Sequence, residues 1–213
     1  MKTSSLLYWF LLWSTSISGQ HIEHILGTSD ISITFFGLDF SKAKIIGIEK
    51  FKPPQKSEQY YFEAWNHLLL SEVHKYDVRR AFMKQTVVYA FDPVQQRNKK
   101  IRRDDFISRR APKNFSKQDL QKLIDAYDTQ KVEGKYGLSL VVHSFNRYQE
   151  KGYLYIVFFD IQTKEILFYE KMVGEAGGFG FRNYWARTFY NVLADIRDYK
   201  LRQWRNQLGL SAP

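Results

Sequence analysis

Three consecutive apolar segments in the second half of the chain constrain its fold most strongly. They cover residues 137–146 (GLSLVVHSFN), 153–161 (YLYIVFFDI) and 165–173 (EILFYEKMV), and their β-branched and aromatic content predicts strands. The connections between them are too short for a crossover, so neighbouring strands must run antiparallel. We therefore predict a three-stranded meander. The middle strand is apolar on both faces, and we expect it to be covered on both sides.

A glycine-rich corner and one long aromatic helix follow the meander. The corner runs from Gly174 to Arg182 (GEAGGFGFR) and lacks the Gly-Lys-Ser/Thr pattern of a phosphate loop. We interpret its glycines as a sharp turn that lets the helix approach the sheet closely, with an anion site at Arg182 as the alternative. The helix carries an apolar stripe that should pack on the sheet. This stripe consists of Trp185, Phe189, Val192, Leu193, Ile196 and Tyr199.

The first half of the chain predicts further strands and helices. Segments 31–38 (ISITFFGL) and 85–91 (QTVVYAF) have strand composition, and apolar spacing predicts helices over 57–76 and 116–127. We expect a single α/β domain over residues 31–208, followed by a short tail over 209–213. Its predicted class is α+β, an α/β sandwich with a mainly antiparallel sheet of five or six strands and helices packed on it.

The first nineteen residues are typical of a secretory signal peptide. Lys2 precedes an apolar run over 6–13 (LLYWFLLW), and small polar residues follow as far as Gly19. The run is shorter than the roughly twenty residues that span a bilayer. We predict cleavage after Gly19 and a linker over 20–30; an uncleaved anchor or a buried amino-terminal helix is the alternative. The mature protein is expected to be soluble, and periplasmic or secreted.

The formal net charge of +10 indicates anionic partners or a solvated basic surface. The densest basic run lies within an insertion predicted over 94–111. It suggests either a solvated, partly disordered segment or a loop that touches anionic lipid or glycan. Few aromatic residues accompany it, and this, with export, argues against nucleic acid. The candidate anion-binding residues are Arg97, Lys99, Lys100, Arg102, Arg103, Arg109, Arg110 and Arg182.

Residues that could perform catalysis are scattered along the sequence. Asp39 and Asp160 each end a predicted strand, where a carboxylate either binds a ligand or holds a turn. His21 and His24 have helical spacing but no partners that would complete a metal site. The absence of cysteine excludes a thiol nucleophile and a thiolate zinc site. We predict no catalytic residue, no cofactor and no metal. The alternative is a hydrolase or anion-binding enzyme that uses Asp39, His143, Asp160 and the corner.

Three stretches carry a resemblance to a known domain: VVHSFN, YIVFFDIQTKEILFYEKM and GGFGFRNYWARTFYNVL. In these and in its element order, the chain resembles the α/β domain found at the amino terminus of TolB and in the curli secretion-channel protein. It is also similar to exported bacterial proteins of unknown function that share the last strand, corner and helix. The resemblance implies a non-enzymatic interaction module of a cell-envelope complex, with an envelope protein as partner. The lipobox cysteine that many such proteins carry is missing. A peripheral binder of anionic membrane through Arg97–Arg110 is a further alternative.

Overall fold

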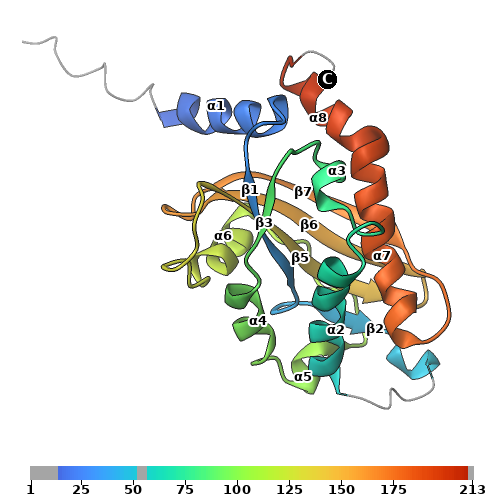
Figure 1. The fold of residues 1–213 in the computed structure, drawn as a ribbon. Coiled ribbons are helices and arrows are strands. Elements are labelled where there is room, and N and C mark those ends of the chain that lie inside the picture. Colours follow the sequence, from blue (N-terminus) through green and yellow to red (C-terminus); the bar gives the residue numbers. More distant parts are fainter. Residues whose placement is uncertain (1–13, 52–56, 211–213) are drawn as a thin grey trace, which may run out of the picture.

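The computed structural model describes residues 14–51 and 57–210, with side chains described from His21 onward (Figure 1). Residues 1–13, which hold the charged and apolar parts of the predicted signal peptide, lie outside this range, as do residues 211–213 of the predicted tail. The helices are α1 Ser14–Gly27, α2 Glu58–Ser71, α3 Val78–Ala81, α4 Asp92–Asn98, α5 Arg103–Phe106, α6 Lys117–Asp125, α7 Phe181–Asp195 and α8 Leu201–Gln207, with a 3-10 turn η1 at Ile48–Lys50 and a π turn η2 at Ile196–Lys200. The strands are β1 Ile33–Asp39, β2 Lys44–Ile46, β3 Val87–Tyr89, β4 Ile107–Ser108, β5 Tyr136–Asn146, β6 Lys151–Asp160 and β7 Ile166–Glu175.

The described strands form one seven-stranded sheet of mixed direction. Strands β1 and β2 lie end to end along the same edge of β5, and β3 and β4 lie outside them. All of these pairings are parallel. On the other edge of β5, strands β6 and β7 complete the antiparallel meander. The sheet therefore has a parallel half and an antiparallel half that share β5.

The prediction of a mainly antiparallel sheet of five or six strands is wrong. The order β3-β1-β5-β2-β4 is parallel throughout, and antiparallel pairing in the described chain begins only where β5 meets β6. The short turns of the meander fix the direction of three strands only. The chain between β1 and β5 is long and contains α2, α4 and α6, so it can return to the starting edge and give parallel strands.

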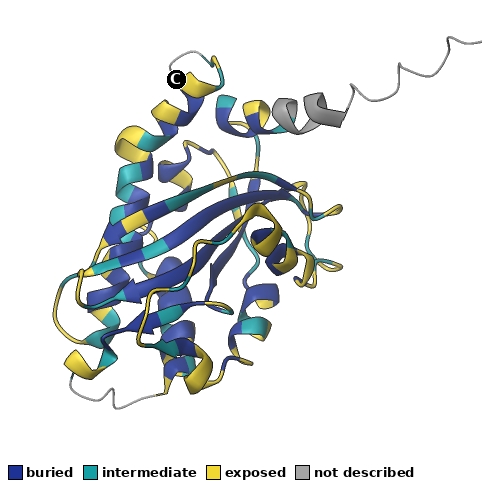
Figure 2. Ribbon diagram, turned by 180° about the vertical axis from the view of Figure 1, so that it is seen from behind, coloured by how far each residue is buried: buried dark blue, intermediate teal, exposed yellow. Residues whose placement is uncertain are grey.

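Both faces of the sheet are covered in the middle. Leu154, Ile156 and Phe158 of β6 belong to the larger core cluster, which also holds apolar residues of α1, α2, α3, α7 and α8. The alternate residues of β6 belong to a smaller cluster that includes Val94 of α4 and apolar residues of α6. The prediction that this strand is covered on both sides is confirmed. In Figure 2 the central strands are buried, and the exposed residues lie mainly on the outer sides of the helices and in the loops.

The aromatic stripe of α7 packs on the sheet as predicted, up to the π turn. Trp185, Phe189 and Ile196 are buried. Tyr199, expected in the same stripe, is instead 46% exposed. A π turn adds a residue to the helical repeat, and η2 therefore rotates the following residues relative to the sheet. Leu201 and Trp204 are buried beyond it and continue the contact.

Helix α1 occupies much of the segment predicted as a linker over 20–30. Ile22, Ile25 and Leu26 have helical spacing and are buried in the larger core cluster. Two cationic side chains satisfy carbonyl oxygens at and just beyond the end of this helix: Lys84 donates to those of Ile25 and Thr28, and Arg205 donates to those of Leu26 at 2.8 Å and Gly27 at 3.2 Å. The apolar face of residues 22–26 thus belongs to the domain core.

The basic stretch over 94–111 is built into the domain. It contains most of α4, all of α5 and the short strand β4, which pairs in parallel with β2. Val94, Ile101 and Phe106 are buried and hold the stretch against the sheet and α2. The apolar residues spaced through the basic run explain why it folds.

Candidate functional site

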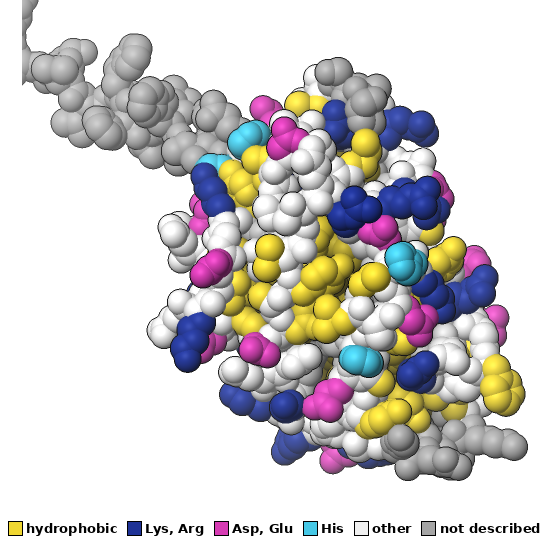
Figure 3. Space-filling view, in the orientation of Figure 1, with side chains coloured by type: hydrophobic (Ala, Val, Ile, Leu, Met, Phe, Trp, Pro, Cys, Tyr) yellow, Lys and Arg dark blue, Asp and Glu magenta, His cyan; other side chains and the backbone are white. Residues whose placement is uncertain are grey.

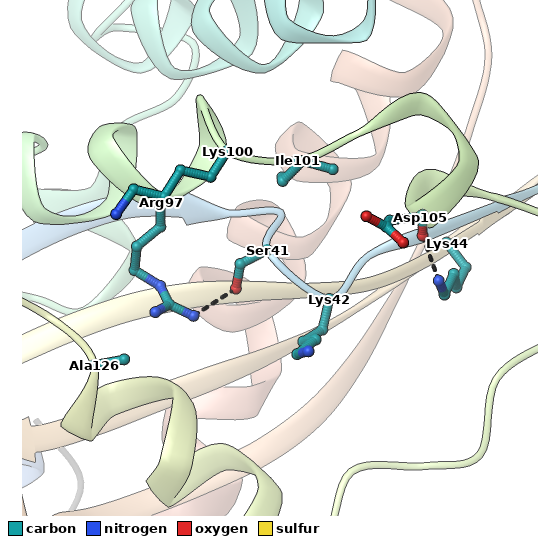
Figure 4. A pocket seen from close by; sticks show the side chains of 8 residues that line it. All are labelled: Ser41, Lys42, Lys44, Arg97, Lys100, Ile101, Asp105 and Ala126. Carbon is teal, nitrogen blue, oxygen red and sulfur yellow. Dashed lines mark hydrogen bonds between the residues drawn. The ribbon is translucent and has the colours of Figure 1, made fainter.

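A basic cavity of about 540 Å³ lies beside the end of β1 (Figure 4). It is formed by the loop between β1 and β2, the end of α4 with the residues after it, and the end of α6. Its lining residues are Ser41, Lys42, Lys44, Arg97, Lys100, Ile101, Asp105 and Ala126.

Buried Asp39, the last residue of β1, holds Arg97 beside the cavity. The Asp39 carboxylate accepts hydrogen bonds from the Ser41 amide at 2.7 Å and the Tyr127 hydroxyl at 2.9 Å. Nε of Arg97 lies 3.5 Å from Oδ2 of Asp39, and Nη2 of Arg97 donates to Oγ of Ser41 at 2.8 Å. Burial, and after it the charge of Asp39, raises the pKa of Tyr127 well above its ordinary value. Tyr127 therefore stays protonated and keeps donating to Asp39.

Two buried amide side chains shape the chain at the end of β1. The β1–β5 register shifts between Phe35 and Leu38, which interrupts the regular hydrogen-bonding ladder. Asn66 accepts a hydrogen bond from the Leu38 amide at 2.8 Å, and Asn98 accepts one from the Phe40 amide at 2.8 Å. Asn98 also donates to the Leu38 carbonyl at 2.9 Å. These bonds replace ladder bonds that the bend removes, and they set the course of the loop that carries Ser41.

The remaining basic residues of the 94–111 stretch point to several different partners. Lys99 lies 3.9 Å from a Glu63 carboxylate oxygen, and Arg102 binds Asp105 at 2.9 Å. Arg103 pairs with Glu58, and Arg109 and Arg110 are exposed. On the face shown in Figure 3, Lys and Arg lie mostly around the margin, interspersed with Asp and Glu. Arg97 and Lys100 are the two members of the predicted set that line the basic cavity.

The residues of the enzyme alternative occupy separate positions. Asp160 accepts hydrogen bonds from the Gln162 and Thr163 amides, which confirms that it holds the turn after β6. In the β5 register Asp160 lies opposite Tyr136, whereas Asp39 lies opposite Val141 further along β5. Arg182 lies in the first turn of α7 and lines a different cavity.

His143, the histidine of the enzyme alternative, lies in β5 and is buried. Its Nδ1 lies 2.8 Å from Oγ of Ser144, and its Nε2 lies 3.0 Å from the Lys113 carbonyl oxygen. The ring packs edge-on against Phe115 and Tyr155. Burial lowers the pKa of His143 below its ordinary value.

A second cavity, of about 670 Å³, lies at the glycine corner. It is lined by Leu68, Glu72, Lys75, Tyr76, Gly177, Gly178, Phe179, Arg182, Asn183, Ala186, Arg187 and Tyr190. Gly178 and Gly180 adopt positive φ angles of 107° and 79°, and Phe179 between them is 96% exposed. Gly174, at the start of the corner, lies against the α7 backbone at Thr188. The packing interpretation of the corner is confirmed for Gly174.

The two histidines with helical spacing near the amino terminus, for which no metal role was predicted, make other contacts. Nδ1 of His21 lies 3.1 Å from the Tyr136 hydroxyl, and His24 accepts a hydrogen bond from Thr28 through its carbonyl oxygen. Across the described part of the chain, His, Asp and Glu side chains do not gather in threes where they would hold a metal ion. Within residues 14–51 and 57–210, every helix falls short of the length and apolarity that crossing a bilayer requires.

Sequence reasoning missed Lys42, Lys44 and Tyr127. The two lysines lie shortly after the predicted strand 31–38, and polar residues after a strand are a known signal for ligand sites in α/β folds. That signal singled out Asp39 but was not extended to its neighbours. Tyr127 follows α6 and ends the apolar stripe predicted over 116–127, and its hydroxyl has no sequence signature that distinguishes it from a core tyrosine.

Comparisons with known proteins found a weak structural match, whereas neither a protein-family model nor a curated protein matches the chain. Among solved structures, the LpoB C-terminal domain from Salmonella enterica matches with a TM-score of 0.31 and 13% identity, over 74% of this chain and 92% of that one. This is a weak structural resemblance.

Proposed function

We propose that this chain is a non-enzymatic protein of the bacterial cell envelope that is exported and binds another envelope protein through its glycine corner. The observation that carries the proposal is Phe179. A phenylalanine ring is costly to leave in water, and this one is 96% exposed between two glycines with positive φ. Aromatic side chains presented in this way serve as anchors at protein interfaces.

Cationic side chains surround the anchor and indicate the chemistry of the partner. Lys75, Arg182 and Arg187 line the cavity next to Phe179, against one carboxylate, Glu72, which already lies 3.4 Å from Lys75. A complementary surface would offer an apolar pocket for the ring and carboxylates at its rim. We therefore expect an acidic partner protein.

Site-specific photo-cross-linking in the native envelope tests this function. A benzoylphenylalanine at position 179 should give a discrete cross-linked species with one partner, and the same label at position 199 should not. Tyr199 is the matched control because it is also an exposed aromatic residue but lies in η2, beyond the cavity lining. Reversing two charges with Arg182→Glu and Arg187→Glu should abolish the cross-link. Identical cross-linking patterns at 179 and 199, or none at either, would contradict the proposal.

Export has a separate readout. The protein isolated from the envelope should begin at Gln20, as the predicted signal peptide requires. Retention of Met1 in a cytoplasmic protein would rule out the export part of the proposal while leaving the cross-linking result to decide the binding part.

A further inference from the structure

We propose that the basic cavity at the end of β1 is a binding site for a phosphate group. This site goes beyond the proposed function, because the lining residues of the basic cavity and those of the glycine-corner cavity do not overlap. The proposal rests on the charges that line the cavity, the way Arg97 is held, and the place of the cavity in the sheet.

The cavity lining is strongly cationic. Lys42, Lys44, Arg97 and Lys100 line it together with one carboxylate, that of Asp105, and the Lys44 ammonium donates to the Asp105 backbone carbonyl oxygen (Figure 4). That carboxylate is bound by Arg102, whose hydrogen bond is the main cause of the lowered pKa of Asp105. The negative charge of buried Asp39 offsets the positive charge of Arg97. The side chains that line the cavity nevertheless keep a net positive charge, which would attract an anion. Four cations brought together on one cavity repel one another, and a multiply charged anion would relieve that repulsion.

Arg97 is positioned before any ligand arrives. Its side chain is 19% exposed, its guanidinium lies 5.6 Å from the centre of the Tyr127 ring, and Ser41 and Asp39 hold one side of it. Buried Nε makes no hydrogen bond to any described residue. In Figure 4 one terminal nitrogen points to Ser41 and the other points away from it. A fixed guanidinium fork of this kind suits phosphate oxygens, which it can bind through two parallel hydrogen bonds.

The position of the cavity fits a ligand site. It lies outside the carboxyl end of β1, a parallel strand with neighbours on both sides, β3 and β5. Ligands of α/β sheets bind in the crevice outside the carboxyl ends of parallel strands. The volume of about 540 Å³ has room for a phosphate together with the group that it esterifies.

Calorimetric titration of the full mature chain tests the site. The probes are inorganic phosphate, glycerol 3-phosphate and malonate, a dicarboxylate of similar charge. The phosphate probes should bind saturably at one site and more tightly than malonate. The double variant Lys42→Gln/Lys100→Gln should bind them at least about tenfold more weakly, since each lost contact to a charged group is a sizeable part of the affinity.

The matched control is Lys117→Gln/Lys122→Gln, which removes two exposed lysines from α6 outside the cavity. It should bind like the unchanged protein. Sedimentation with vesicles of phosphatidylglycerol and phosphatidylcholine distinguishes the source of the phosphate. Vesicle binding that only the cavity variant loses, without binding of the soluble probes, would assign the phosphate to a lipid headgroup. Equal binding of malonate, equal behaviour of the two double variants, or no binding of either soluble phosphate probe and none of the phosphatidylglycerol vesicles would overturn the proposal.

Discussion

Replacing Gly174 by alanine is expected to destabilise the protein by about 2–3 kcal/mol, because the close seat of α7 on the sheet leaves no room for a side chain. A Cβ at position 174 would lie 2.3 Å from the carbonyl oxygen of Thr188 and 3.0 Å from its carbonyl carbon. An ordinary contact between carbon and oxygen is roughly 3.3 Å, so the two backbones must separate by about 1 Å. Atoms of a helix backbone cannot rotate out of the way.

This separation of the two backbones would loosen the packing of the buried face of α7. Trp185, Phe189 and Val192 are buried on that face, within four residues of Thr188. A gap of about 0.5–1 Å already removes a quarter to a half of the dispersion energy of each contact. The loss is shared among large side chains, which is why we expect the upper part of the usual range for overpacked sites.

Gly177→Ala is the matched control within the same corner. A Cβ there would meet only the flexible side chain of Arg187, at 3.4 and 3.8 Å. Both substitutions restrict the unfolded chain equally, which favours folding by about 0.4–1 kcal/mol. Gly177→Ala should therefore be as stable as the unchanged protein or slightly more stable, and the difference between the two variants isolates the clash at Thr188.

Urea unfolding followed by tryptophan fluorescence gives the measurement. Gly174→Ala should lower the midpoint without changing the slope, and its thermal midpoint should fall by roughly 4–12 °C. Equal midpoints for Gly174→Ala and Gly177→Ala would refute the reasoning, since they would show that α7 does not rest on the backbone of β7.

Two further predictions concern buried ionisable groups. Asp39→Ala should cost about 3–5 kcal/mol, because it leaves Arg97 without its counter-charge and the Tyr127 hydroxyl without its acceptor. Asp39→Asn keeps an acceptor and should cost less, so equal urea midpoints for the two variants would contradict this account. Burial holds the pKa of His143 below its ordinary value of about 6.5, so the unfolded chain takes up this proton first as the pH falls. The stability that neutral His143 contributes is complete above about pH 6.5 and is lost as the pH falls through the folded pKa. His143→Gln should flatten the dependence of the urea midpoint on pH below that point, and an unchanged slope would refute the assignment.

The parts of the fold that the sequence predicted are those fixed by local chemistry. The turn after β6 is so short that β7 must fold back beside it, and Asp160 supplies the hydrogen bonds that close that turn. The stripe of α7 is predictable for the same reason, since Trp185 and Phe189 lie one helical turn apart. Neither inference needs to know where the rest of the chain lies.

The parallel half of the sheet depends on contacts between distant segments. Strand β1 pairs with β5, and no sequence pattern in the chain between them indicates whether β5 runs parallel or antiparallel to β1. Strand β3 falls within the predicted segment 85–91, but β2 has three residues and β4 has two, too few to show the alternation that identifies a strand. Their pairing depends on residues far apart in the sequence, which a local pattern does not describe.

The basic cavity shows why charge density along a sequence is a poor guide to a binding site. The densest run supplied Arg97 and Lys100, while Lys99 and Arg103 lie beside Glu63 and Glu58, which are distant in the sequence, and Arg102 pairs with Asp105 within the run. The other half of the cavity comes from the loop after β1, more than fifty positions earlier in the chain. What joins the two halves is Asp39: a carboxylate buried at the end of a strand requires a cation, and Arg97 meets that requirement from α4. The same ion pair that stabilises the chain at the end of β1 therefore brings a rigid guanidinium close to Lys42 in the loop and Lys44 at the start of β2, so the proposed phosphate site arises from the way the strand ends.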